Sequence, residues 1–270
     1  MFRYVFLVLC LGAGILVLVG CGEEPTPPNI PTNVRITQVI NSGLGVKIEW
    51  DAVAEADGYK VLFEGTEIGD VAVTYFNDDD PGDVGDYTVK AYTDGEESSP
   101  SDAVSTEPVT GGSVIYERSA AGNSAFGWAA NGTGITASLN DPYDGWDFYA
   151  DDFQAGTTDL VHIHLVSPSW DLDGTPFSTE DTTWISDSPV NYDTLDVAPT
   201  TGYSEMGPFE SDPGNPTDGL NAREGYVIDA VVEGNRHYAK VKITAIGPND
   251  NVDFSYAFQT VPGFRRLDTQ

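Results

Sequence analysis

Residues 225–259, GYVIDAVVEGNRHYAKVKITAIGPNDNVDFSYAFQ, decide the fold of this chain. The first apolar run starts at Tyr226, and a short turn at 233–235 separates it from a second run at 238–243. A third run, VDFSYAFQ, covers residues 252–259. Strand-like runs joined by short polar turns predict a three-stranded β meander.

Similar strands are predicted nearer the N-terminus. GVKIEW at 45–50, GYKVLF at 58–63 and DYTVKAY at 86–92 alternate apolar and polar residues, with Gly- and Asp-rich turns between them. Short strands at this spacing over about 80 residues indicate a sandwich of immunoglobulin type. Because no 3.6-residue period predicts a helix after residue 113, the expected class is all-β throughout.

The charge balance excludes one class of partner. The 270 residues include 12 Lys+Arg and 43 Asp+Glu, a formal net charge of −31. Such a field repels phosphate backbones, so nucleic-acid binding is not expected. The acidity is interpreted as solvation, as in a protein from a saline habitat.

The N-terminus indicates export. Residues 1–20 contain one basic residue, Arg3, and then an uncharged apolar run that is short for a bilayer span, which favours a signal peptide. The run ends in Leu18-Val19-Gly20-Cys21, which resembles the bacterial lipobox and implies cleavage before Cys21 and lipid attachment to it. A chance Cys at the end of a membrane helix is the alternative. Several acyl chains at Cys21 would anchor the protein stably to a membrane.

The segment after Cys21 bears on localisation. Glu23-Glu24 resembles the export signal of Bacteroidetes surface lipoproteins, which implies a surface-exposed protein on the bacterial outer membrane. A plain spacer explains the same two residues. Residues 21–30 are Pro-rich and are expected to form an extended tether.

Two domains are expected after the tether. Thr110-Gly111-Gly112 marks a boundary, which gives domains at 31–110 and 111–270. PTNV at 31–34, Trp50 followed by DAV, and Tyr87 in YTVKAY resemble a fibronectin type III module. The resemblance implies that Trp50 and Tyr87 are core residues of a fibronectin-like sandwich.

The second domain has a resemblance of its own. The meander of residues 225–259, together with Trp146-Asp147-Phe148 upstream, resembles the HmuY-type lipoproteins of Bacteroidetes. Those are all-β proteins that capture haem between two axial side chains, often His and in some members Met. The resemblance therefore implies haem as the first candidate ligand and an HmuY-like β domain over residues 111–270.

Candidate axial ligands are His162, His164 and Met206. His162 and His164 are two residues apart on an apparent strand, so their side chains share a face and their Cα atoms lie roughly 6.6 Å apart. Axial ligands approach iron from opposite sides of the ring, so at most one of this pair is axial. Met206 is the expected partner, since haem iron accepts mixed nitrogen and thioether ligation. His237 lies after a hairpin turn on a solvent-prone strand and is a poorer candidate.

Other interpretations of these side chains stay open. The two histidines also fit ordinary strand alternation with a partly exposed polar face and no function, or a site for another metal. Four tryptophans, Trp128, Trp146, Trp170 and Trp184, fit a sugar-stacking platform or, more often, structural anchors of the core.

The motifs of common enzymes are missing from the sequence. No G-x-S-x-G, H-E-x-x-H, Walker or dinucleotide-binding motif occurs, so the protein is not expected to be an enzyme. The expected function is ligand capture at the cell surface, with an outer-membrane receptor as a further partner. The alternative is an adhesion or glycan- or protein-binding module that does not ligate haem.

Overall fold

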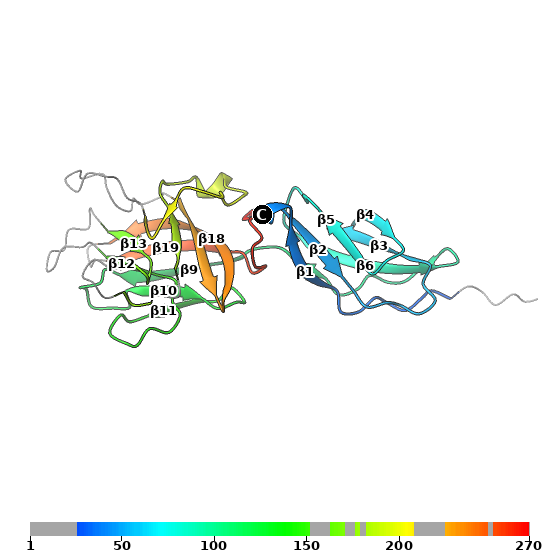
Figure 1. Cartoon of the computed structure of the whole chain (residues 1–270), viewed down its shortest axis with the longest axis horizontal. Coiled ribbons are helices and arrows are strands. Elements are labelled where there is room, and N and C mark those ends of the chain that lie inside the picture. Colours follow the sequence, from blue (N-terminus) through cyan, green and yellow to red (C-terminus); the bar gives the residue numbers. More distant parts are fainter. Residues whose placement is uncertain are drawn as a thin grey trace, which may run out of the picture.

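The computed structural model describes residues 26–151, 163–170, 176–178, 182–207, 225–247 and 251–269. The described elements are strands in four antiparallel sheets with short 3-10 turns, so the predicted all-β class is confirmed. Figure 1 shows two β bodies end to end. We call residues 26–108 the first body, 109–258 the second body and 259–269 the C-terminal segment. The expected signal peptide and Cys21 lie outside the described residues.

The first body contains two sheets. One has the strand order β1-β2-β5, and the other has the order β4-β3-β6-β7 with β8 also paired to β6. The strands are β1 Arg35–Ile40, β2 Gly45–Glu49, β3 Gly58–Phe63, β4 Thr66–Val71, β5 Tyr75–Asp78, β6 Asp86–Thr93, β7 Glu96–Glu97 and β8 Val104–Ser105. A 3-10 turn, η1 Asn41–Gly43, joins β1 to β2.

Period-two alternation explains how these sheets pack. Val46 and Ile48 of β2 point inward and are fully buried. Trp50 and Tyr87 are buried as well, which confirms their predicted place in the core. The Trp50 ring packs edge-on against Tyr59 with 5.4 Å between the ring centroids.

The second body also has two sheets. One runs β11-β10-β12-β13-β16, and the other runs β15-β14-β17-β18-β19-β9. The strands are β9 Val109–Tyr116, β10 Ala125–Trp128, β11 Gly134–Ala137, β12 Phe148–Asp151, β13 His164–Val166, β14 Trp184–Ser186, β15 Tyr203–Ser204, β16 Met206–Gly207, β17 Gly225–Val232, β18 Asn235–Ile246 and β19 Asn251–Phe258. A second 3-10 turn, η3 Tyr192–Thr194, precedes β15.

The predicted meander is present as β17, β18 and β19. Glu233 and Gly234 both have positive φ, which matches the two-residue hairpin turns whose twist fits paired strands. Strand β19 then pairs along its length with β9, the strand that follows the first body. Aromatic rings fill the space between the two sheets: Phe126, Trp128, Phe148, Phe254, Tyr256 and Phe258.

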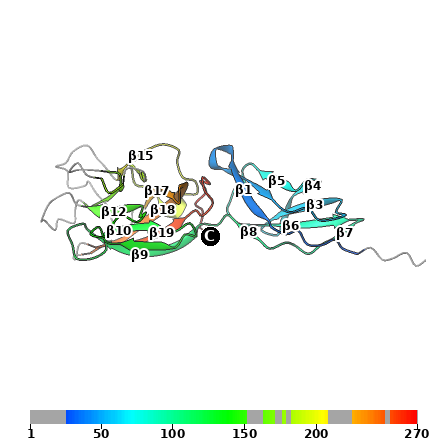
Figure 2. The same ribbon diagram turned by 60° about the horizontal axis from the view of Figure 1, so that its bottom comes forward.

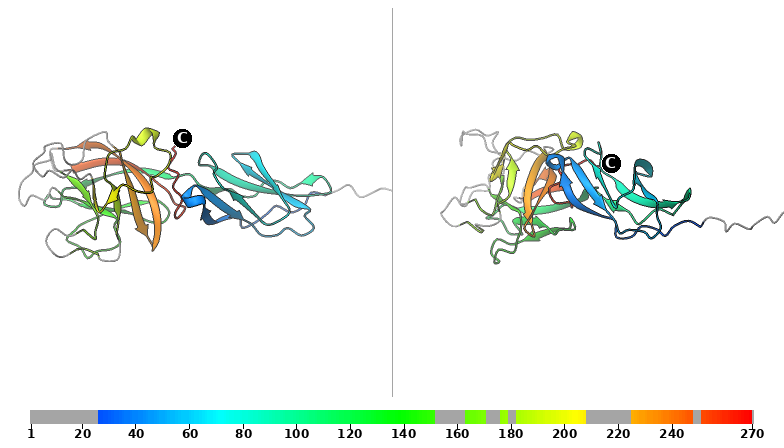
Figure 3. Two further views of the ribbon diagram at one scale, coloured as in Figure 1. Left: turned by 45° about the horizontal axis from the view of Figure 1, so that its top comes forward. Right: turned by 45° about the vertical axis from the view of Figure 1, so that its right-hand side comes forward.

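The C-terminal segment joins the two bodies. Val261 and Phe264 are buried in the core of the first body, although they follow the last strand of the second. Gln259 Nε2 donates to the carbonyl of Thr106 at 2.9 Å. Figures 2 and 3 show this end of the chain between the bodies from other directions. The predicted division at residues 110 and 111 stays a prediction, but one terminal segment completes a core on the other side of it.

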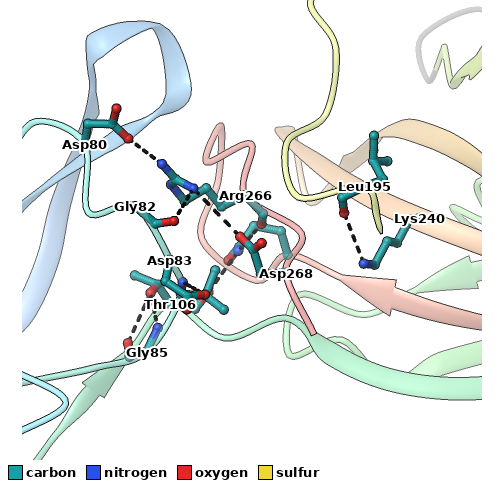
Figure 4. Close-up of polar contacts among 11 residues, drawn as sticks. Asp80, Gly82, Asp83, Gly85, Thr106, Leu195, Lys240, Arg266 and Asp268 are labelled. Atoms are coloured by element: carbon teal, nitrogen blue, oxygen red, sulfur yellow. Dashed lines mark hydrogen bonds and ion pairs between the residues drawn. The ribbon is translucent and has the colours of Figure 1, made fainter. Parts of the chain in front are cut away.

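Charged side chains reinforce this contact (Figure 4). Arg266 donates to the carbonyl of Gly82 at 3.0 Å and forms an ion pair with Asp80, both in the first body. Asp268 lies 3.9 Å from the same guanidinium. Burial and the neighbouring carboxyl of Asp196 raise the pKa of Asp268 to about 6. The contact therefore contains a carboxyl group that titrates near neutral pH.

Candidate functional site

A pocket of about 440 Å³ lies where the two bodies meet. We call it the junction pocket. Its wall combines aromatic rings, hydroxyls and guanidinium groups, which suits a small polar ligand with an apolar face. The lining residues are Ser42, Trp184, Pro199, Thr200, Thr201, Gly202, Tyr203, Asp229, Arg236, Tyr238, Gly263 and Arg265.

Strand register builds one wall of the pocket. Trp184 of β14 pairs with Asp229 of β17, and Asp229 pairs with Tyr238 of β18. Residues directly opposite each other on adjacent strands project from the same face of a sheet. Ile228 precedes Asp229 and Ala239 follows Tyr238, and both are buried in the core between the sheets. Because neighbouring residues of a strand point to opposite faces, Asp229 and Tyr238 project from the outer face of the sheet.

An ion pair crosses this wall. Arg236 Nε donates to Asp229 Oδ1 at 2.9 Å, and a second nitrogen of the guanidinium contacts Oδ2. Asp229 is buried, whereas the Arg236 side chain is 59% exposed. Burial raises the pKa of Asp229 and Arg236 opposes that rise. This two-point contact uses two of the five guanidinium N–H groups of Arg236 and leaves the others available to a ligand.

Arg265 brings a second guanidinium to the pocket. Its Nε donates to the carbonyl of Ala198 at 2.8 Å, and Nη1 donates to the carbonyl of Ser42 at 3.1 Å. Its backbone N–H donates to the carbonyl of Gly43 at 2.8 Å. Ser42 and Gly43 belong to the first body, so the side chain is fixed between both bodies.

Two tyrosines complete the wall. Tyr203 donates its hydroxyl hydrogen to the carbonyl of Pro199 at 2.9 Å. Burial is the main cause that raises the pKa of both Tyr203 and Tyr238, so both are neutral phenols at neutral pH. A neutral phenol can donate or accept a hydrogen bond, which suits a ligand that carries hydroxyl groups.

Trp184 differs from the other tryptophans. Trp128 and Trp146 are 3% and 4% exposed, which confirms their interpretation as structural anchors, whereas Trp184 is 37% exposed. Trp170 is half-buried. An exposed indole beside hydrogen-bonding groups is the usual composition of a binding surface rather than of a core.

A second hollow, of about 1020 Å³, lies beside β10 and β11 and next to the β17–β18 turn. Its tryptophans, Trp128 and Trp146, are buried, so they offer little ring surface to a ligand. Three carboxylates, Asp141, Asp144 and Glu233, line it. The charged residues of this hollow are therefore negative, like the net charge of the whole chain, whereas the junction pocket holds two guanidinium groups.

The candidate haem ligands lie in a different part of the second body. His164 is a buried residue of β13, paired in register with Asp151 of β12. Met206 begins β16 and pairs with Val166 of β13. His162 lies outside the described residues. The partly exposed face expected for the histidine pair is therefore wrong for His164.

Backbone pairing bears on the expected His–Met pair. His164 and Met206 lie on adjacent strands of one sheet, and such strands run about 4.8 Å apart. That spacing is too small to place a porphyrin between the two backbones, because the ring plane would have to separate hydrogen-bonded strands. The described residues contain no group of three or more His, Cys, Asp or Glu that suits a metal ion. Haem ligation by these residues stays a prediction.

His237 corrects an expectation. It was expected on a solvent-prone strand, but the side chain is 2% exposed. Its Nδ1 lies 2.8 Å from the carbonyl of Gln259, and its ring stacks on Phe258 with 5.1 Å between centroids. Burial lowers the pKa of His237. This histidine is a satisfied core residue.

Comparisons with known proteins leave the family open. The chain matches no protein-family model and no curated protein sequence. Among the described residues, none of the helices has the length and apolar character needed to span a bilayer.

Apart from Trp184, the residues of the junction pocket were not identified from the sequence, and the two arginines are the most important of them. Arg236 follows a hairpin turn and Arg265 belongs to an Arg-Arg pair near the C-terminus. The sequence signal that could have identified them was their positive charge, because basic residues are rare in a chain with 12 basic and 43 acidic residues. Their meeting in one pocket depends on long-range strand pairing that no local pattern specifies.

Proposed function

We propose that the protein is a non-catalytic, lipid-anchored surface protein that binds a saccharide in the junction pocket. The observation that carries the proposal is the position of Trp184. It is an exposed tryptophan, and it lies in a row with Asp229 and Tyr238 along a pocket wall that also holds arginine donors. A sugar presents apolar C–H faces to an aromatic ring and hydroxyls to donors and acceptors, and this pocket offers both kinds of partner.

Loss of the exposed indole tests the proposal. We expect the full chain to bind members of a panel of neutral and acidic oligosaccharides, and Trp184→Ala to weaken that binding by roughly tenfold or more, as for a hot-spot aromatic. Tyr75→Ala is the matched control, because Tyr75 is 44% exposed but lies on β5 of the first body. Binding to no member of the panel, or equal binding by Trp184→Ala, would contradict the proposal.

Anchoring at Cys21 is the second part of the proposal. It is supported by the apolar run that ends at Cys21 and by the Pro-rich residues 21–30 that follow. We expect Cys21→Ser to abolish labelling by a radioactive or alkyne-tagged fatty acid and to leave unprocessed precursor. Unchanged labelling would show that Cys21 is not the acylated residue.

Haem capture is the second candidate function. It is favoured by His164, a buried imidazole paired in register with the carboxylate residue Asp151. Carboxylate neighbours commonly orient imidazole ligands of metals. Titration of the full chain with haemin should then give a saturable Soret change that His164→Ala alters. A linear, unsaturated response would exclude this candidate.

A further inference from the structure

We infer that the saccharide bound in the junction pocket carries a carboxylate, which Arg265 holds with help from Arg236. The inference rests on the proposed function and adds the chemical class of the ligand. It starts from the distribution of charge, because a pocket with two guanidinium groups is unusual in a chain with a net charge of −31.

Arg265 differs from the other arginines that the structure describes. Arg35, Arg118, Arg236 and Arg266 each form an ion pair with a carboxylate. Within the described residues, Arg265 has no such pair, and its side chain donates to the carbonyls of Ala198 and Ser42. Carbonyl oxygens satisfy N–H groups but do not neutralise the charge. The positive charge of Arg265 is therefore left for a partner outside the described residues.

Arg265 still has donors for that partner. A guanidinium carries five N–H groups, and three of them are used in bonds to Ala198 and Ser42. Two remain on terminal nitrogens. Arg236 keeps three, because its bonds to Asp229 use two. A carboxylate oxygen accepts such hydrogen bonds more strongly than a neutral hydroxyl does.

The fold holds Arg265 in place before any ligand arrives. Gly43 has a φ of +92°, and a Cβ there would lie 2.6 Å from Cδ of Arg265. A glycine at this position is therefore needed for the stem of Arg265 to pass between the bodies. A side chain fixed in this way loses little freedom on binding, which favours recognition of a charged group.

The negative field of the whole chain does not prevent this contact. Charges more than about 8 Å away are largely screened at physiological ionic strength, so distant carboxylates contribute little inside the pocket. The local charge comes from Arg265, because Arg236 and Asp229 neutralise each other. With Trp184 as the aromatic surface, the pocket suits an acidic sugar such as a uronic acid.

Matched sugar pairs test the inference. Methyl β-D-glucuronide and methyl β-D-glucoside differ only in a carboxylate in place of a hydroxymethyl group, and the galacturonide and galactoside form a second pair. We expect the full chain to bind at least one uronide tenfold or more tightly than its neutral partner, measured by calorimetry. Arg265→Gln should remove that preference, whereas the control Arg35→Gln should keep it.

The outcomes separate this inference from the proposed function. Equal binding of both members of each pair, with Trp184→Ala weakening both, would overturn the carboxylate inference and leave saccharide binding intact. Failure of all four sugars to bind would overturn the carboxylate inference, and failure of the oligosaccharide panel to bind as well would overturn saccharide binding. Because Arg265 also contacts the first body, Arg265→Gln is checked by circular dichroism. If it does not fold, Arg265→Met replaces it, because methionine keeps an unbranched apolar stem and removes the charge, and an unchanged uronide preference in that variant would overturn the inference.

Discussion

Neighbouring residues near the C-terminus have opposite surroundings. Arg266 is buried against Asp80 and the carbonyl of Gly82, whereas Arg265 lines the junction pocket and its side chain donates hydrogen bonds only to carbonyls among the described residues. In an extended segment, consecutive side chains point to opposite sides. One arginine therefore joins the bodies by ion pairing, and the other presents its charge to the pocket.

The burial of a single residue, Trp50, predicts how much its replacement lowers stability. Its ring is 3% exposed and packs on Tyr59, and its Nε1 has no hydrogen-bond partner among the described residues. Trp50→Ala should lower the free energy of unfolding by about 3–5 kcal/mol, because it removes the buried ring and its packing contacts. Trp50→Phe keeps a ring against Tyr59 and should cost less. Urea unfolding measures both, and a loss in Trp50→Ala below about 1 kcal/mol would place Trp50 outside the core.

Among the elements, the C-terminal segment contributes to both bodies. Val261 and Phe264 fill the core of the first body, while Gln259 bonds to Thr106 at its edge. The first body therefore includes side chains that lie about 150 residues further along the chain, by the separation of Gln259 and Thr106. A fragment that ends at residue 109 lacks them.

Phe264 tests the contribution of this segment. It is fully buried, so Phe264→Ala should cost about 3–5 kcal/mol of unfolding free energy. Val109→Ala is a suitable control, because Val109 is 38% exposed and surface changes usually stay within about 0.5 kcal/mol. If Phe264→Ala unfolds in urea like the control, the segment does not stabilise the first body.

Local patterns predicted the elements better than the contacts between them. The meander of 225–259 was predictable because period-two strands and a Gly-containing turn are local signals. The segment around Phe264 has no such period, and Pro262 and Gly263 indicate only a turn. His237 was misplaced because its position after a hairpin turn suggested exposure, whereas the Phe258 ring on the neighbouring strand and the Gln259 carbonyl just after that strand cover it.

The candidate site was only partly predictable for a related reason. Trp184 was identified as one of four candidate aromatic residues, but its exposure depends on which sheet face it occupies. Its partners Arg236 and Arg265 come from β18 and from the C-terminal segment. Their meeting with Trp184 depends on the order of strands in the sheet, which a single sequence does not specify.

On the scale of the whole molecule, carboxyl groups lie at the contact between the bodies. Asp268 is close to Asp196 of the second body. Asp83 of the first body also lies near it, with Arg266 and Lys240 as the nearby cations (Figure 4). Its pKa is raised to about 6, mainly by burial and then by Asp196. At pH 7 the contact therefore holds an ionised carboxylate that its surroundings disfavour.

This contact should weaken as the pH rises. An aspartate in an unfolded chain has a pKa near 3.9, so the folded protein binds the Asp268 proton more tightly than the unfolded chain. The stabilising contribution is fully present below pH of about 4 and is lost as the pH rises through about 6. Asp268→Asn should remove this part of the pH dependence. Thermal unfolding of both proteins between pH 4 and 7 measures it, and parallel curves would contradict the assignment.

In the proposed ligand site of the junction pocket, Trp184 and Arg265 act together. The sharpest measurement is a crystal structure of the full chain soaked with whichever of the two methyl uronides binds it more tightly. We expect the sugar ring to lie against the Trp184 indole with its carboxylate within hydrogen-bonding distance of the Arg265 guanidinium. A saturating soak that leaves the pocket empty, or that places the sugar elsewhere on the molecule, would show that the junction pocket is not the binding site.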